Sequence, residues 1–419
     1  MKQVHPELGM SSLKRQKLAP DRFSDLPDDL LRDVMFFLTL QEAVQTCLLS
    51  RRWQNVWESM MWLNFDAAKF RSMKTFKKFV DNFLMYRSSL LVPVPLDAFW
   101  IFATCNSSDD SLDYSDIHPW ICHALASNAW ALGIMKHSGN KLLSMEGYPF
   151  PFISVHLKLL HLCHFSIDDC FVKNLTSGCP VLDDLELVNC AINVTMFCST
   201  ILKSLTITST HTDEDFPKEF QHLVIDMPNL VDLRLEEIPR RNIHLVDVSL
   251  VERASIYFFS LSFENSNVDC NIVSALSNAT RLELVSPSVF EDVVPKVLQR
   301  DLPRCETFSN LKHLKLGEWF LRGGCYPLLY LLHRSPCIET VVLQLDESGV
   351  DDYDDVRFPN AEAEVDPPCK ETEITFSCEK LRRIEVYCPQ GEKRAKIILR
   401  ILSAHLSPLP EIEVKPIKD

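Results

Sequence analysis

The chain has 419 residues and a formal net charge of −14, with 46% apolar and 24% charged residues. This length suffices for two or three domains or for one elongated repeat array. The negative charge argues against general nucleic-acid binding, which needs basic faces to neutralise phosphates. No apolar run is long enough to span a bilayer, and the first 20 residues lack the apolar core of a signal peptide. We therefore expect an intracellular protein of the nucleus or cytoplasm, with no membrane partner.

The chain contains 15 cysteines, an odd number, and none of them form a Cys-x-x-Cys pair. Scattered single cysteines without an export signal indicate reduced, mostly buried thiols. Residues 1–20 are polar and are expected to form a disordered tail. The basic cluster Lys14, Arg15 and Lys17 within it is either an import signal or, more simply, part of a solvated tail.

Residues 21–66 have the pattern of a small helical domain. Pro27 followed by Asp28 and Asp29 favours a first helical turn, because the ring presets φ and the carboxylates face the positive end of the helix dipole. Thr39 and Glu42 have capping-box spacing, which predicts the start of a second helix. A third segment carries Trp53 and Trp57. The apolar stripe of the first helix is Leu30, Leu31, Val34, Phe37 and Leu38.

So small a unit buries little by itself, so these apolar faces pack either on another protein or on the rest of this chain. The stretch resembles an F-box, through Leu26-Pro27, Leu30-Leu31, Phe37-Leu38, the Ala43–Leu49 helix, and Ser50-Arg51-Arg52-Trp53 followed by Trp57. Met35 and Cys47 depart from the usual pattern but pack as adaptable hydrophobes.

The resemblance implies docking on a Skp-family adaptor and, through it, on the cullin of a RING-type ubiquitin ligase. The residues expected to carry adaptor docking, some of which must instead hold the helices together, are Leu26, Pro27, Leu30, Leu31, Val34, Phe37, Leu38, Val44, Leu48, Leu49, Trp53 and Trp57. We expect the largest effects from Leu30, Phe37 and Trp53, because buried apolar and aromatic anchors dominate interfaces.

Residues 67–92 predict an amphipathic connector helix, and residues 93–388 carry a repeated Leu-x-x-Leu-x-Leu template. The template or a variant of it starts at 96, 129, 157, 182, 202, 230, 251, 279, 311, 338 and 381. Turn signals precede three of the copies, and there we expect a helix to stop and the chain to turn. They are Gly178-Cys179-Pro180, Met227-Pro228-Asn229 and Ser335-Pro336-Cys337, the last after a helical stretch with Leu328, Leu329, Leu331 and Leu332.

The repeated segment resembles the leucine-rich-repeat region of plant F-box proteins, and the tail from Ile397 to Pro416 is similar to the small FBD-like closing segment of that group. Cys190 falls at the polar-ladder position that such repeats fill with Asn or Cys. The resemblance implies an irregular coil with parallel strands on a concave face and helices or loops on the convex face.

On such strands the residues between the leucines face the concave side. Their charge is acidic in the early repeats and mixed to basic in the later ones, which would orient a charged partner segment. Outward strand positions are polar in any case, so the pattern also fits a solvated face. The residues proposed to bind a target protein are Asp184, Glu186, Asp232, Arg234, Arg253, Arg281, Glu283, His313 and Lys315.

An insert at residues 346–376 is acidic and poor in apolar residues, so we expect a mobile, solvated loop or a site for a basic segment. From Asp346 to Glu373 it holds eleven acidic and two basic residues, a local charge of −9. The chain has no Gly-rich phosphate loop and no nucleophile or metalloprotease motif. On a strand the side chains of His161, Cys163 and His164 do not all point to the same side, so we expect no metal site there. We also expect no cofactor and no catalytic residue. The sequence neither supports nor excludes a small-molecule co-ligand.

These features predict an α/β protein with an N-terminal three-helix F-box (21–66), a connector helix (67–92) and a curved leucine-rich-repeat solenoid (93–388) closed by a short cap (389–419). The function that this arrangement favours is a non-catalytic substrate receptor of a cullin-type ubiquitin ligase, with an unknown protein target. A leucine-rich-repeat scaffold outside any ligase is the alternative. An extracellular receptor would fit the repeats and the four Asn-x-Ser/Thr sequons, but the signal peptide it needs is missing.

Overall fold

The computed structural model describes residues 26–49, 52–53, 56–103, 112–136, 142–208, 222–236, 242–257, 271–285, 301–305, 307–345, 377–389 and 393–416. The expected N-terminal tail with its basic cluster and the acidic insert at 346–376 lie outside these residues. The chain divides into two units, residues 1–63 and 64–419.

The first unit contains two short helices, α1 (Asp28–Phe36) and α2 (Leu40–Gln45). Pro27 is the N-cap of α1 rather than its first helical residue. The capping box predicted at α2 is confirmed, since the Glu42 amide donates to the Thr39 hydroxyl and the Thr39 amide donates to the Glu42 carboxylate. The 3₁₀ turn η1 (Thr46–Leu48) follows α2 directly, within the predicted Ala43–Leu49 helix. Of the predicted third segment the structure describes residues 52–53 and 56–59, and these include the 3₁₀ turn η3 (Trp57–Ser59). Ser59 accepts a hydrogen bond from Arg32 of α1, which ties the last turn to the first helix.

The main sheet has the strand order β1-β2-β3-β4-β6-β9-β11-β13-β14-β15-β16-β17-β18. Its strands from β2 to β18, all in the second unit, pair in parallel with their neighbours. The strands are β1 (Trp62–Asp66), β2 (Ala98–Ala103), β3 (Ala131–Lys136), β4 (Leu159–Cys163), β6 (Asp184–Val188), β9 (Ser204–Thr208), β11 (Asp232–Glu236), β13 (Arg253–Tyr257), β14 (Arg281–Val285), β15 (His313–Leu316), β16 (Thr340–Gln344), β17 (Arg383–Cys388) and β18 (Glu411–Pro416).

Each of the eleven predicted templates is a strand of this sheet, and every strand begins two residues after the template does. The template leucines are buried, as at Leu185 and Leu187 of β6, while the residues between them are partly exposed. This alternation is what a pleated strand produces. The prediction of a leucine-rich-repeat solenoid is therefore confirmed.

The two end strands were missed, although they keep the template spacing with other apolar residues. Met60, Leu63 and Phe65 have this spacing at β1. Leu409, Ile412 and Val414 have it at β18, which pairs in parallel with β17 and ends the sheet. The helix before β18, α9 (Lys393–His405), completes the closing segment.

Two helices follow the first strands of the main sheet, α3 (Met73–Ser88) after β1 and α4 (Tyr114–Ala126) after β2. The amphipathic face predicted for the connector is confirmed, because Phe76, Val80, Phe83 and Leu84 of α3 are buried. Trp120 of α4 lies with its ring edge-on to Phe76 at a centroid distance of 6.0 Å, and its indole N–H donates to Asp81 at 2.7 Å. These contacts fix α4 against α3.

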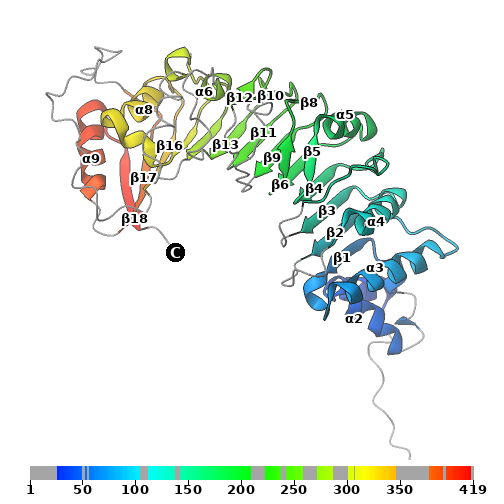
Figure 1. Ribbon diagram of the computed structural model, residues 1–419. Coiled ribbons are helices and arrows are strands. Elements are labelled where there is room, and N and C mark those ends of the chain that lie inside the picture. The colour runs from blue at the N-terminus through cyan, green and yellow to red at the C-terminus, as the bar shows by residue number, and fades with distance from the viewer. Residues whose placement is uncertain are drawn as a thin grey trace, which may run out of the picture. The chain divides into compact units, whose positions relative to one another are not determined.

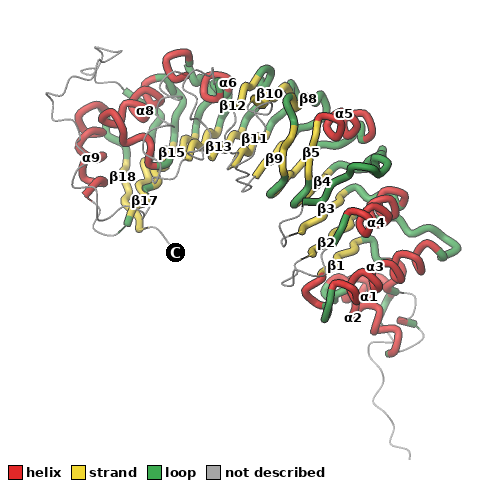
Figure 2. Tube along the Cα trace, viewed as in Figure 1, coloured by secondary structure: helices red, strands yellow, loops and turns green. Residues whose placement is uncertain are grey.

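One side of the main sheet is covered by helices and also by short strands (Figures 1 and 2). The helices are α5 (Asp169–Gly178), α6 (Ile272–Ala275) and α8 (Arg322–His333). The strands form two small parallel sheets, β5 (Ser166–Asp168) with β7 (Ala191–Asn193), and β8 (Met196–Cys198), β10 (His222–Asp226) and β12 (Asn242–Leu245). The expectation of only helices or loops on this side was therefore incomplete.

The three predicted joints differ in what precedes them. α5 ends at Gly178 and α8 ends shortly before Ser335, as predicted. The turn at Met227-Pro228-Asn229 follows the strand β10, so the prediction of a helix there was wrong. Leu223 and Ile225 of β10 are both buried, which is the period-two burial of a strand and not the stripe of a helix.

Cysteine thiols connect successive turns of the coil. The twelve cysteines that the structure describes are free. Cys190 donates to the Leu162 carbonyl at 3.4 Å and accepts from the Phe165 amide at 3.4 Å. Cys163 and Cys179 likewise donate to carbonyls 27 residues earlier in the chain. The polar-ladder role predicted for Cys190 is confirmed, and burial raises the pKa of its thiol to about 12.

We expect Cys190→Ala to lower the free energy of unfolding by about 1–3 kcal/mol, because a buried amide and carbonyl lose their partner. The matched control is Cys170→Ala, since the Cys170 side chain is exposed on α5. Chemical denaturation of the two variants beside the parent chain provides the measurement. Equal stability of all three would show that the thiol contributes nothing to the ladder.

Candidate protein-binding surfaces

The first unit exposes large apolar side chains. Phe37 and Leu48 are each 84% exposed, Leu49 is 70% exposed and Leu30 is 47% exposed. Phe37 follows the last residue of α1, and Leu48 and Leu49 follow α2. Large apolar side chains that a small soluble domain leaves exposed suit a site of protein interaction. We call the exposed residues Leu30, Phe36, Phe37, Leu48 and Leu49 the apolar patch.

The structure separates the twelve residues that the sequence assigned to adaptor docking. Pro27, Leu30, Phe37, Leu48 and Leu49 are exposed, whereas Leu31, Trp53 and Trp57 are buried, and Leu26, Val34, Leu38 and Val44 are partly exposed. Trp53 has only 4% of its surface exposed, so it supports the helices and offers no surface to a partner. Its expected large effect would come from packing.

The docking residues predicted from the sequence omit Phe36, a member of the apolar patch. The apolar stripe predicted for α1 omits Met35. Phe36 is exposed, and its ring packs edge-on against those of Phe37 and Trp62 at 6.0 and 6.1 Å. Met35 is completely buried, with the Thr46 hydroxyl 4.0 Å from its sulfur. The buried side of α1 is thus formed by Leu31 and Met35, one turn apart. The two consecutive phenylalanines, Phe36 and Phe37, are the sequence feature that indicates the exposed side.

The second unit presents the outward strand positions of the main sheet, which we call the strand face. Register places one row of side chains straight across it, from β2 to β15: Trp100, Gly133, His161, Glu186, Thr206, Arg234, Ser255, Glu283 and Lys315. The neighbouring row includes Asp184, Ser204, Asp232, Arg253, Arg281 and His313. All nine residues proposed for target binding lie in these two rows.

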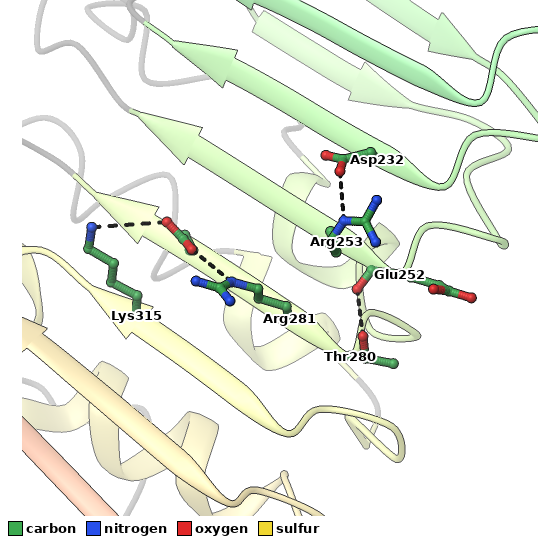
Figure 3. Close-up of polar contacts among 7 residues, drawn as sticks. Asp232, Glu252, Arg253, Thr280, Arg281 and Lys315 are labelled. Atoms are coloured by element: carbon green, nitrogen blue, oxygen red, sulfur yellow. Dashed lines mark hydrogen bonds and ion pairs between the residues drawn. The ribbon is translucent and has the colours of Figure 1, made fainter. Parts of the chain in front are cut away.

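Ion pairs join these charged residues across and along strands (Figure 3). Arg253 of β13 donates to Asp232 of β11 at 2.7 Å. On β14, Arg281 pairs with Glu283 at 3.0 Å, and the same carboxylate lies 4.0 Å from the Lys315 ammonium on β15. Near β13 the Thr280 hydroxyl donates to the Glu252 carbonyl. Exposed pairs of this kind contribute little stability, typically below about 1 kcal/mol. Their positions are therefore more relevant to recognition of a partner than to the stability of the sheet.

Two carboxylates on β6 differ in their environment. Glu186 lies 2.6 Å from the His161 ring, and this hydrogen bond lowers its pKa. Burial raises the pKa of Asp184, and the nearby charges of Glu186 and Asp232 act in the same direction, against a hydrogen bond from Ser204. Within the described residues Asp184 forms no ion pair with a lysine or arginine. An added cation would therefore stabilise the charged form of Asp184.

Metal binding has no support in the described segments, where no cluster of three His, Cys, Asp or Glu side chains has the arrangement of a metal site. His161 of the cluster noted in the sequence is engaged with Glu186 on the strand face. Among the same residues, no helix combines the length and apolar character that crossing a bilayer requires.

Comparisons with known proteins match two segments of the chain to described domain families. Residues 23–64 match the F-box domain, and residues 151–387 match the At1g61320/AtMIF1 LRR domain. The F-box/LRR-repeat protein At4g14103 of Arabidopsis thaliana is 26% identical over 375 residues, covering 77% of this chain and 91% of that protein.

Other relatives carry a further segment in their names. The F-box/FBD/LRR-repeat protein At1g51370 of Arabidopsis thaliana is 23% identical over 374 residues, covering 85% of this chain and 81% of that protein. A shorter match, 31% identical over 219 residues, joins the chain to an FBD-associated F-box protein of the same plant. It spans 51% of this chain and half the length of that relative.

Proposed function

This chain belongs to the plant-type F-box/leucine-rich-repeat proteins, and we propose that it is the substrate-recognition subunit of a Skp-adaptor/cullin/F-box ubiquitin ligase. In this proposal the F-box docks on a Skp-family adaptor, the adaptor joins it to a cullin, and the strand face of the solenoid binds a target protein for ubiquitination.

The observation that carries the proposal is the apolar patch, which lies within the residues that match the F-box domain. Apolar and aromatic side chains that fill pockets of a partner supply most of the energy of an interface. Phe37 and Leu48 are the members with the greatest exposure and are therefore the proposed anchors. Leu31, Trp53 and Trp57 would hold the helices that present them.

The proposed mechanism is proximity, with no bond made or broken by this chain. A target held on one unit while the other binds the ligase experiences a high effective concentration of the ubiquitin-charged enzyme. The second unit is suited to holding a target because its charged rows occupy fixed register positions on a continuous sheet. We place this assembly inside the cell, in nucleus or cytoplasm, which suits the free thiols that join its repeats.

The test is co-purification of a Skp-family adaptor and a cullin with the full chain. It is compared with a Phe37→Asp/Leu48→Asp double variant, in which two charges would enter the docking surface, and with a Leu91→Asp variant. Leu91 is a fully exposed apolar residue outside the apolar patch. Capture by the parent and by Leu91→Asp, but not by the double variant, is the expected result. A folded parent chain that captures no adaptor would leave the scaffold alternative in its place.

A further inference from the structure

The first strands of the solenoid carry an aromatic platform on the strand face. Trp100 of β2 lies directly over Gly133 of β3, since a Cβ on that glycine would come within 1.9 Å of the indole. The Phe102 ring is 6.4 Å from that of Trp100 and nearly parallel to it, and the His161 ring is 6.1 Å away. Trp100 and Phe102 are partly exposed. The glycine lets the indole lie on the sheet, so that its other side is available to a partner.

Next to the platform the face is acidic. Asp184 and Glu186 lie on β6, and Asp232 and Glu236 lie on β11, with Arg234 between the last two. Asp184 has neighbouring negative charges and, among the residues described, no lysine or arginine partner. A Lys or Arg side chain of a bound segment can serve as that partner.

Further along, the face is basic. Arg253 and Arg281 are direct neighbours in register, and Lys315 follows on β15. Asp232 and Glu283 are the carboxylates paired with these three cations. The side chains of Arg253 and Arg281 remain more than half exposed. Two adjacent arginines whose side chains are this exposed can accept a further carboxylate supplied from outside.

We propose that the strand face binds one extended segment of a target protein that crosses the strands, with an apolar or aromatic side chain on the Trp100 platform, a Lys or Arg at Asp184, and an Asp or Glu at Arg253 and Arg281. This inference rests on the proposed function, since it describes the chemistry of the target. Charge complementarity would set the register and direction of the segment.

Strand spacing fixes the separation of these three groups. From β6 to β14 the sheet advances four strands, roughly 19 Å at about 4.8 Å per strand, which an extended chain covers in about six residues. From β3 to β6 it advances two strands, roughly 10 Å or about three residues. The target segment should therefore read aromatic, then basic about three residues on, then acidic about six residues after that, in one chain direction or the other.

The experiment uses the full chain and fluorescently labelled synthetic peptides in a Ser/Gly background. Each peptide has one Tyr, one Arg and one Glu, and the Arg–Glu separation is varied from about two to ten residues in both chain directions. We expect fluorescence anisotropy to show the tightest binding near a separation of six, weakening about tenfold at the extremes and with added salt. Affinity that is independent of separation, or no binding of any peptide up to about 1 mM, would overturn the inference.

Variants of the chain connect the affinity to the named residues. Arg281→Glu should lose binding of the best peptide and recover it when the peptide Glu is exchanged for Arg. Asp184→Asn should weaken binding about tenfold, and Gly133→Ala should remove the advantage of Tyr over Ser by displacing the indole. Lys173→Gln is the matched control, because Lys173 is exposed on α5. Equal losses in the control, or no recovery with the exchanged peptide, would contradict the proposal.

Failure here and failure of the proposed function give different results. Arg281→Glu should capture the Skp-family adaptor as well as the parent does, because Arg281 lies outside the apolar patch. Adaptor capture without separation-dependent peptide binding would overturn this inference alone. Separation-dependent binding by a chain that captures no adaptor would overturn the ligase function and keep the recognition chemistry.

Discussion

Phe37→Ala should weaken binding of a Skp-family adaptor by about 30-fold or more, the loss of about 2 kcal/mol that marks an interface anchor. The side chain is 84% exposed in the free chain, so its truncation removes little internal packing. Its ring contacts Phe36 edge-on, which keeps it in a defined orientation for a partner pocket. Titration of purified adaptor by calorimetry or interferometry measures the change.

Two control measurements show whether the loss of adaptor affinity comes from the interface. Leu91→Ala removes a fully exposed apolar side chain of the second unit and should leave adaptor affinity unchanged. The thermal midpoint of Phe37→Ala should equal that of the parent chain. Parental affinity in a folded Phe37→Ala variant would exclude this residue as an anchor and move the docking surface elsewhere.

Trp120→Ala should cost about 3–5 kcal/mol of local stability at the N-terminal end of the solenoid, the usual range for removing a buried tryptophan. The variant loses the edge-on contact with Phe76 and leaves Asp81 without the indole N–H that donates to it. Repeat proteins depend on their terminal caps, because each repeat contacts only its neighbours. We expect faster hydrogen exchange in α3, α4, β2 and β3, with little change in β14 to β17.

Trp120→Phe helps to separate the two contributions, since it keeps a ring beside Phe76 but loses the hydrogen bond together with part of the buried ring volume. Trp130→Ala provides the matched comparison, because Trp130 is 38% exposed. A uniform rise in exchange over the whole sheet would contradict a local cap and indicate cooperative unfolding of the unit. Exchange equal to that of the parent would show that the Trp120 contacts do not hold the two helices.

The residues of α1 show what helical periodicity can predict and what it cannot. The stripe Leu30, Leu31, Val34, Phe37 and Leu38 predicts a helix at the right place, but it is too wide to tell the inner side from the outer one. Burial places Leu31 and Met35 inside and leaves Leu30 and Phe37 outside. In a unit with apolar groups on every side, only the packing of α1 against its neighbours decides this.

The contacts between side chains on the strand face could not be predicted from the sequence, for a different reason. The alternation around Leu185 and Leu187 predicts that Asp184 and Glu186 point outward, and burial agrees. It does not predict the contact between Glu186 and His161 or that between Arg253 and Asp232, whose partners are more than 20 residues apart in the chain. Those contacts depend on which strands are neighbours and in which register.

The sequence is enough to predict the architecture of the repeats, because the leucine spacing admits a single periodic solution, a stack of parallel strands with one buried side. It also determined the start of α2, since a capping box is a local arrangement of four residues. Only the folded chain shows that short strands such as β10 take the place of helices on the outer side, and that Gly133 lies under an indole from the neighbouring strand β2. These outcomes arise from contacts between residues far apart in the chain, which local spacing does not encode.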